Sequence, residues 1–350
     1  MPWPMNSSSI AKFMDTNSSG FSIGPYQFSN RLVLAPMAGV TDRPFRQLCR
    51  SLGAGMTVSE MVSSKPELRK TRKSLLRLDH QGEPGPIIVQ IAGADPDIMA
   101  DAARYNVEQG AQIIDINMGC PAKKVCKVEA GSALMKDEKK VAEILVAVVN
   151  AVSVPVTLKT RTGWSRQHKN VSQIAKIAED SGIQALTVHG RTREDKYNGL
   201  AEYDSIRLLK QQLTIPLIAN GDIDSAKKAR TVIDITGADA IMVGRAAQNK
   251  PWIFRHINHY LKTGLELNEP DLTIRKGWLL QHLQNLYEFY GEFQGLRIAR
   301  KHINWQLGEE INYQQNFKRL MMTTETSTEQ TGLIEQLFDQ LQNKHFDTAC

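Results

Sequence analysis

Eight short runs rich in Val, Ile, Leu and Ala recur up to Gly244, and each is long enough for a buried strand of a parallel sheet. Helical stretches separate them: residues 95–109, for example, begin with an Asp-Pro pair suited to a helix start and end before a glycine. Eight strand–helix units over roughly 240 residues predict a (β/α)8 TIM barrel. The predicted strands are Arg31–Pro36, Met56–Glu60, Ile87–Ile91, Ile113–Asn117, Val154–Lys159, Ala185–His189, Ile215–Asn220 and Ala240–Gly244.

An open doubly wound sheet is the competing fold. It usually carries a G-x-G-x-x-G turn after its first strand, and this sequence has no such motif. The strand pattern stops at a polar linker, 263–272, and residues 273–345 have helical spacing, which predicts a small all-α bundle whose helices run to about Phe338. We expect a barrel domain over 21–262 and, because 1–20 is rich in Ser and Asn, a flexible N-terminal tail.

Charge and cysteine content narrow the class of protein. The chain has a formal net charge of +6, and the excess of Lys and Arg lies in the barrel segment, which favours a polyanionic partner there. Four scattered cysteines give neither a disulfide framework nor a metal-ligand spacing, so we expect no metal. No apolar run approaches the roughly 20 residues of a membrane helix and no signal peptide is recognisable, so we expect a cytoplasmic protein.

Polar residues end seven of the eight predicted strands. The carboxyl ends of barrel strands form the active-site mouth, so these side chains are expected to converge there. The loops after strands seven and eight commonly bind phosphate, and glycine there lets backbone N–H groups approach an anion. The residues expected at the mouth are Pro36, Met37, Ala38, Gln90, Asn117, Cys120, Lys159, Arg161, His189, Asn220, Gly221, Asp222, Gly244 and Arg245.

Two of these residues bear directly on chemistry. Cys120 lies in a Gly-Cys-Pro turn just past the fourth strand, and a thiol with an ordinary pKa of about 8.5 is mostly protonated near neutrality, so it can act as a general acid. Lys159 lies within a buried strand, where it can form a Schiff base or a structural ion pair, or can stabilise negative charge on a reduced flavin ring.

The motifs at these strand ends resemble those of the tRNA-dihydrouridine synthases, and the bacterial B-type subgroup most of all. The resemblance covers roughly Gly24 to Leu341, and the Asp-Ile-Asn-Met-Gly-Cys-Pro string at 115–121 is its most specific part. The other matching segments are Ala35–Arg46, Val89–Gly93, Lys124-Val125, Gly131–Leu134, Leu158–Gly163, Thr187–Thr192, Ala219–Asp222, Met242–Ala246 and Arg297–His302. Residues 1–20 and Cys126 fall outside the family pattern.

The resemblance implies an FMN enzyme that uses NADPH (or NADH) to reduce a uridine in the D-loop of tRNA. FMN N5 would deliver hydride to C6 of uracil while Cys120 protonates C5. Pro36, Met37 and Ala38 would line the isoalloxazine, Gln90 and Lys159 its polar edge, and the loops carrying Asn220, Gly221, Asp222, Gly244 and Arg245 would hold the phosphate. His189 and Asn117 would face the flavin and the uracil, and Arg161 the substrate.

A basic cluster in the helical segment completes the expected sites. Arg297, Arg300 and Lys301 are spaced three and four apart, so we expect them to contact tRNA phosphates from one helical face. Two rival functions remain open: an FMN barrel reductase of a small molecule, similar to dihydroorotate dehydrogenase, and an RNA-binding protein without catalysis. The helical segment argues against the first, and the presence of Cys120 and Lys159 against the second.

Overall fold

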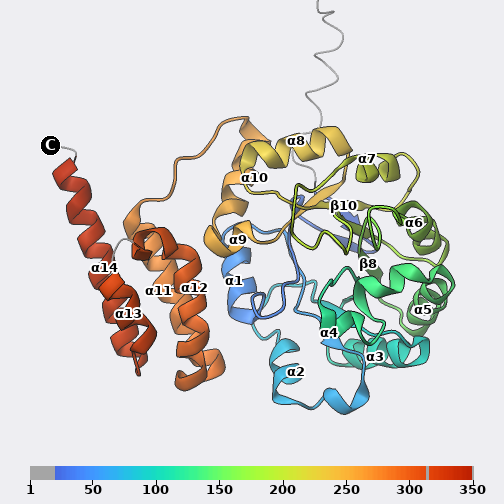
Figure 1. The fold of residues 1–350 in the computed structure, drawn as a ribbon, viewed down its shortest axis with the longest axis horizontal. Helices are drawn as coiled ribbons and strands as arrows, with labels where there is room; N and C mark the ends of the chain where they lie inside the picture. Colours follow the sequence, from blue (N-terminus) through green and yellow to red (C-terminus); the bar gives the residue numbers. More distant parts are fainter. Residues whose placement is uncertain (1–19, 313–314, 349–350) are drawn as a thin grey trace, which may run out of the picture.

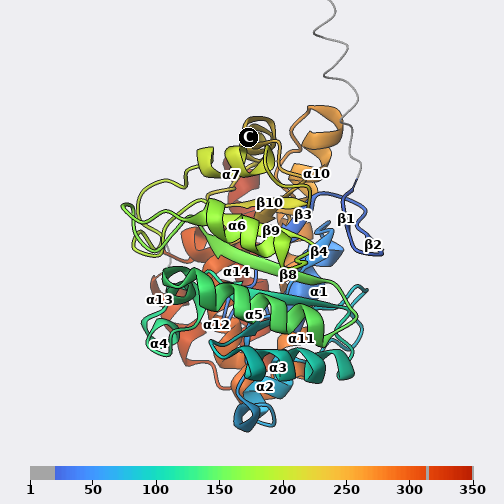
Figure 2. The same cartoon turned by 90° about the vertical axis from the view of Figure 1, so that its right-hand side faces the viewer.

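The computed structural model describes residues 20–312 and 315–348, so all but the last residue of the predicted tail, 1–20, lies outside the described residues. In this part of the chain nine parallel strands curl into a barrel, with helices around it and a helical bundle at one side (Figures 1 and 2). The strands of the barrel are β3 (Leu32–Leu34), β4 (Met56–Thr57), β5 (Val62–Ser63), β6 (Ile88–Ala92), β7 (Ile113–Met118), β8 (Val156–Arg161), β9 (Leu186–His189), β10 (Leu217–Asn220) and β11 (Ala240–Val243).

The order of these strands follows the chain around the barrel, as the predicted fold requires. The sheet runs β4-β3-β11-β10-β9-β8-β7-β6-β5, and its two ends, β4 and β5, are only five residues apart. They are two halves of one broken strand: β4 pairs with β3 and β5 pairs with β6. Ser59, which lies between β4 and β5, donates its N–H to the carbonyl of Ile88 in β6 (3.1 Å), and this hydrogen bond connects the two ends of the sheet. All eight predicted strands are present, and β5 is the one barrel strand that the sequence pattern missed.

Helices cover the outer face of the barrel (Figure 2). The predicted helix start at Asp95 has the expected cap, because Asp95 accepts from the Ile98 N–H (2.9 Å), and Asp137 caps α5 (Glu138–Ala151) in the same way by accepting from the Lys140 N–H (3.0 Å). The long helices of this layer are α1 (Arg43–Ser51), α3 (Pro96–Glu108), α5 (Glu138–Ala151), α6 (Val171–Asp180), α7 (Asp204–Lys210), α8 (Ala226–Thr236) and α10 (Ile253–Thr263). Shorter ones lie in the loops: η2 (Pro66–Leu68), α2 (Arg72–Arg77), α4 (Lys123–Cys126), η3 (Gly131–Lys136) and α9 (Ala246–Asn249).

The barrel interior changes from apolar to polar along the strands. Residues two apart face the same side of a strand, so Ile113, Asp115 and Asn117 all point inward. Ile113 packs with Val33 and Ile88 in an apolar layer at the amino ends of the strands. An N-terminal hairpin that the sequence did not predict, β1 (Ser22–Ile23) with β2 (Tyr26–Gln27), closes that end and buries Phe21, Ile23 and Phe28 in the same layer. The opposite end of the barrel is left for polar side chains.

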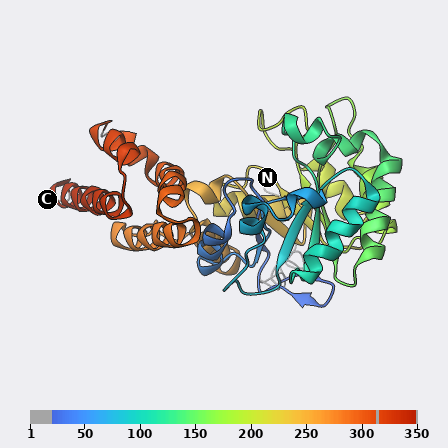
Figure 3. The ribbon, with the colours of Figure 1, turned by 90° about the horizontal axis from the view of Figure 1, so that it is seen from below.

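The C-terminal bundle has its own hydrophobic core. It contains α11 (Leu272–Tyr290), α12 (Glu292–Asn312), α13 (Gln315–Thr323) and α14 (Ser327–Thr348), so the last helix continues past the predicted end at Phe338. The bundle lies beside the barrel, with α11 against α1 and α12 against α9, and it extends away from it (Figures 1 and 3). Buried rings of Phe45, His282 and His302 fill the junction, with centroids 4.7 to 5.8 Å apart. None of the described helices is long and apolar enough to cross a bilayer.

Candidate active site

One large cavity, of about 1350 Å³, lies at the carboxyl ends of the barrel strands. All fourteen residues predicted at the mouth line it, and they come from seven of the predicted strands and their loops. The three basic residues predicted to contact tRNA lie outside it, on α12. The strand topology therefore brings the predicted catalytic and cofactor-binding residues into one site.

A chain of hydrogen bonds crosses the floor of this cavity and ends at the Cys120 turn. The buried Asp115 carboxylate accepts from Thr157 Oγ1 (2.6 Å) and from Gln90 Nε2 (2.7 Å). Gln90 Oε1 in turn accepts from Asn117 Nδ2 (2.7 Å), and Asn117 Oδ1 accepts from the Cys120 N–H (3.0 Å). We call Asp115, Gln90 and Asn117 the amide relay.

The amide relay has a fixed direction. A carboxylate only accepts hydrogen bonds, so Asp115 forces Gln90 to present its NH2 group to it. The Gln90 oxygen must then face Asn117, whose own oxygen is left for the backbone N–H of Cys120. Burial raises the pKa of Asp115 to about 6, and hydrogen bonds from Thr157 and Gln90 limit the rise. The carboxylate therefore remains ionised at neutral pH and orients both amides.

The Cys120 turn is fixed from its other side by η3. The Cys120 carbonyl accepts from the Ser132 hydroxyl (2.8 Å) and from the Ser132 N–H (3.2 Å), and the Cys126 thiol lies 3.6 Å from the same oxygen. Both cysteines are free thiols. Burial raises the pKa of the Cys120 thiol above its ordinary value, so the group carries its proton at neutral pH. A protonated thiol at a cavity wall is suited to donate a proton.

Lys159 places a cation in the cavity floor. Its side chain is only 9% exposed, and burial, reinforced by the charge of Arg161, lowers its pKa to about 8. Its Nζ donates to Asn220 Oδ1 (3.0 Å), and the Asn220 amide is oriented by the Met242 carbonyl (2.7 Å). An ammonium group has three donors, so Lys159 retains two for a ligand in the cavity.

The loops after β10 and β11 form a cationic rim. Asp222 accepts from Arg245 (3.1 Å) and from both terminal nitrogens of the buried Arg191 (2.7 and 2.8 Å). Asp222 is thereby neutralised, and it orients Arg245, which is 55% exposed and faces the opening. Gly221 has φ +128°, and a Cβ there would come within 2.6 Å of the Ala201 Cβ, so this position requires glycine.

His189 lies inside the mouth as an uncharged ring. Burial lowers its pKa well below the ordinary value, and the charges of Lys159, Arg161 and Arg191 lower it further. Arg191 Nη1 lies 3.4 Å from His189 Nε2, and a guanidinium can only donate, so Nε2 is the unprotonated nitrogen. His189 can therefore donate from Nδ1 but adds no charge to the site.

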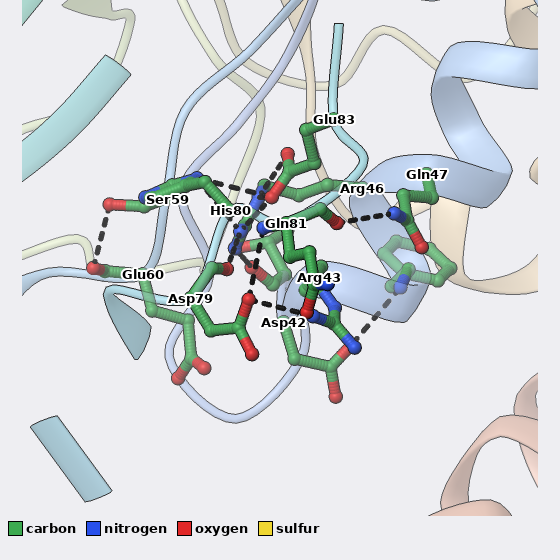
Figure 4. A network of polar contacts seen from close by, with 12 residues as sticks. Asp42, Arg43, Arg46, Gln47, Ser59, Glu60, Asp79, His80, Gln81 and Glu83 are labelled. Atoms are coloured by element: carbon green, nitrogen blue, oxygen red, sulfur yellow. Dashed lines mark hydrogen bonds and ion pairs between the residues drawn. The ribbon is translucent and has the colours of Figure 1, made fainter. Parts of the chain in front are cut away.

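A network of polar contacts (Figure 4) lies next to residues 36–41 at the cavity and bonds to their backbone. The Gly39 N–H donates to Glu60 (2.6 Å), and Arg46 donates to the Thr41 carbonyl (2.8 Å) while pairing with Glu83. Asp42 caps α1 and also accepts from the Tyr290 hydroxyl (2.9 Å) at the end of α11. The cavity wall is thus connected to the helical bundle.

The predicted basic cluster on α12 is divided by the packing of the bundle. Arg297 and Lys301 are exposed, whereas Arg300 is half-buried and donates to the Thr324 carbonyl (2.8 Å). Arg300 therefore contributes to the structure of the bundle, and Arg297 and Lys301 remain available at the surface.

Several site residues were absent from the expected set. Asp115 stands within the motif at 115–121, and its inward direction follows from the period of two along β7, a signal that could have identified it. Ser132 and Tyr197 line or support the mouth from loops whose paths no periodicity indicates. Within the described residues, no group of three or more His, Cys, Asp or Glu side chains is placed to hold a metal ion.

Fold and cavity together define a (β/α)8-barrel protein with a protonated thiol, a buried cation and a cationic rim at one mouth. A family model described as "Dihydrouridine synthase (Dus)" matches residues 33–344. The chain therefore belongs to the dihydrouridine synthase family, whose members are flavin-dependent oxidoreductases.

Curated relatives agree with this assignment. The chain is 59% identical over 331 residues to "tRNA-dihydrouridine synthase B" of Pseudomonas aeruginosa, covering 94% of this chain and 98% of that protein. It is 58% identical to the proteins of that name from Shewanella oneidensis and Escherichia coli K12, in each case over 91% of this chain and 98% of the relative. Among solved structures, histamine dehydrogenase from Rhizobium sp. 4-9 shares the fold (TM-score 0.52) at 11% identity, over 77% of this chain and 51% of that one.

Proposed function

We propose that the protein reduces the C5–C6 double bond of a uridine in the D-loop of tRNA, giving 5,6-dihydrouridine, with FMN as cofactor and NADPH or NADH as electron donor. The observation that carries the proposal is that the protonated Cys120 thiol and the buried Lys159 cation line the same cavity. Identity of 58–59% to tRNA-dihydrouridine synthases over almost their whole length supports tRNA as the substrate.

The residues present fit FMN. Lys159 is a buried cation with two spare donors, which suits the electron-rich edge of a flavin ring, and Gln90 lies on the same floor. Gly221 and Gly244 leave the rim open to a phosphate, and Arg245 faces it. Pro36, Met37 and Ala38 offer an apolar wall for the isoalloxazine. When bound, FMN supplies to C6 of uracil the hydride that it has accepted from the nicotinamide.

The protein's own contribution is to supply the proton and to position it. Hydride arriving at C6 places negative charge on C5 and O4, so a proton must reach C5. The Cys120 S–H bond breaks, the proton goes to C5, and the thiolate formed is reprotonated from solvent. The amide relay and Ser132 hold the turn that carries this thiol. Asn117 and Arg161 line the same wall and are assigned to the uridine.

The two parts of the chain divide the work in this proposal. Residues 21–262 form the FMN-binding catalytic domain, 263–272 the linker, and 273–345 a tRNA-binding domain. Arg297 and Lys301 on α12 and the basic surface of the barrel supply charges for the RNA backbone, which a protein can contact without reading its sequence. The extruded uridine then enters the mouth, as enzymes acting on bases require.

The test is direct. Purified protein with bound flavin is incubated with NADPH and tRNA from cells lacking dihydrouridine synthases, and the nucleosides are analysed by mass spectrometry. We expect dihydrouridine at one D-loop position, with no turnover of free pyrimidines. Turnover of orotate or uracil without any change in the tRNA would establish the small-molecule reductase instead.

A further inference from the structure

The loop Lys196–Ala201, which follows β9 at the rim of the cavity, is anchored along its whole length. Arg161, which is 2% exposed, donates to a carbonyl of the loop (2.9 Å). Arg191, which is 3% exposed, donates to two more (3.2 and 2.6 Å), and Asp222 accepts the N–H of Ala201 (2.8 Å). Two buried guanidinium groups and a carboxylate thus fix the path of this loop, which we call the rim loop.

The rim loop nevertheless holds two large apolar side chains in solvent. Leu200 is 91% exposed, more than any other large apolar residue in the described part of the chain, and Tyr197 is 54% exposed. Both belong to the lining of the active-site cavity. A single exposed leucine on a surface needs no explanation. Leu200 differs because the loop that presents it is pinned by buried charges and stands at the opening through which a substrate must enter.

Tyr197 is placed by cations on the same rim. The guanidinium carbon of Arg245 lies 4.9 Å from its ring centroid, that of Arg161 lies 5.7 Å away, and the His189 ring is 6.3 Å away. These contacts hold the aromatic ring between the cationic rim and the cavity. Leu200, three residues further along the rim loop, extends into solvent.

We propose that Leu200, which lies on the same loop as Tyr197, packs against the nucleobase adjacent to the uridine that is reduced. This inference rests on the proposed function, because it requires an RNA substrate. A uridine that leaves its stack exposes one face of its neighbour to water. Apolar side chains commonly fill such a gap in proteins that distort nucleic acids. The rim loop offers one at the opening, and its rigid anchorage means that little order is lost on contact.

The experiment compares Leu200→Ala with Leu208→Ala as a matched control. Leu208 is 45% exposed on α7 and is not part of the cavity lining. Loss of base packing predicts a decrease of about tenfold in kcat/KM for tRNA in Leu200→Ala, near the lower end of the factors of about 5 to 150 that follow removal of an aromatic ring stacked on a base. The control is expected to remain within twofold of the unmodified protein, and FMN content is expected to be the same in both variants.

A second substrate identifies the contact. Leu200→Ala and the unmodified protein are each assayed on transcripts that carry an abasic site on the 5′ or the 3′ side of the target uridine. If Leu200 packs against that base, one of the two abasic transcripts abolishes the difference between Leu200→Ala and the unmodified protein. Equal losses on intact and abasic transcripts, or no loss in Leu200→Ala, would overturn the inference. A failure of the proposed function looks different, because the unmodified protein itself would then form no dihydrouridine.

Discussion

The direction of the amide relay can be tested by reversing it. In Asn117→Asp, Gln90 lies between two carboxylates, at 115 and at 117, and its single oxygen must face one of them across about 2.7 Å. An acceptor forced against an acceptor in a buried site costs about 1–3 kcal/mol, and more when a charge is involved. We therefore expect Asn117→Asp to lower the free energy of unfolding by at least about 2 kcal/mol at pH 7.5.

The reversed pair restores every contact. With Asp115→Asn added, the new amide at 115 donates to the Gln90 oxygen and still accepts from Thr157. Gln90 then donates to the carboxylate at 117, whose other oxygen accepts from the Cys120 N–H. The double variant is expected to recover about 2 kcal/mol relative to the sum of the two single variants, a coupling typical of residues within one hydrogen-bond network.

Urea unfolding of the four proteins, followed by circular dichroism with flavin bound and removed, measures this coupling. Asn106→Asp provides the control, because Asn106 is buried on α3 and donates to a carbonyl of its own helix, outside the relay. Combined with Asp115→Asn, it should be additive within about 0.5 kcal/mol. If Asn117→Asp and Asp115→Asn are equally additive, the two amides are not oriented in series and the argument for the relay fails.

Three further predictions concern the remaining parts of the site. Cys120→Ala should keep FMN and its reduction by NADPH but form dihydrouridine about 10²–10⁴-fold more slowly in single-turnover assays, and undiminished product would remove the thiol as the acid. Lys159 has a pKa of about 8, so retention of reduced flavin should fall as the pH rises through that value, and Lys159→Met should bind flavin weakly at every pH. Flavin released from the reduced protein is separated, reoxidised in air and quantified by its fluorescence, and an unchanged pH profile in the variant would contradict the assignment. Replacing Arg297 and Lys301 with Ala should lower the slope of log tRNA affinity against log salt by about one for each phosphate that the variant no longer binds, whereas Arg300→Met should instead lower the unfolding temperature; a normal salt slope in the double variant would place the RNA elsewhere.

Strands and the cavity were readable from the sequence for a physical reason. Parallel strands are covered on both faces, so each must be a continuous apolar run, and a polar residue at the end of such a run stands at the mouth. The break in the second strand was not readable, because Val62-Ser63 is too short to carry a period. The hairpin β1–β2, which covers the amino end of the barrel, was not predicted for the same reason, because its strands have two residues each.

The functional state of individual side chains was less predictable. The sequence identifies residue 115 as Asp but does not say whether its carboxylate faces solvent or the amides of the cavity floor. The register of β7 decides this. Arg300 shares a helix with Arg297 and Lys301, but α13 and its following turn pack on one edge of that helix, and this packing is not encoded in the spacing of the three residues. Packing between helices, rather than the local spacing of the residues, therefore distinguishes the structural Arg300 from the exposed Arg297 and Lys301.

The hydrogen bond between Tyr290 and Asp42 connects the end of α11 to the start of α1 behind the cavity wall, and the rings of Phe45, His282 and His302 pack beside it at steep angles to one another. Barrel and bundle are therefore joined at the cavity wall by both a hydrogen bond and packed rings. In the proposed function, the span from Arg297 and Lys301 on α12 to the Cys120 thiol then decides which nucleotide of a folded RNA reaches the thiol. On this view, the choice of nucleotide is a measurement of length as much as a reading of bases.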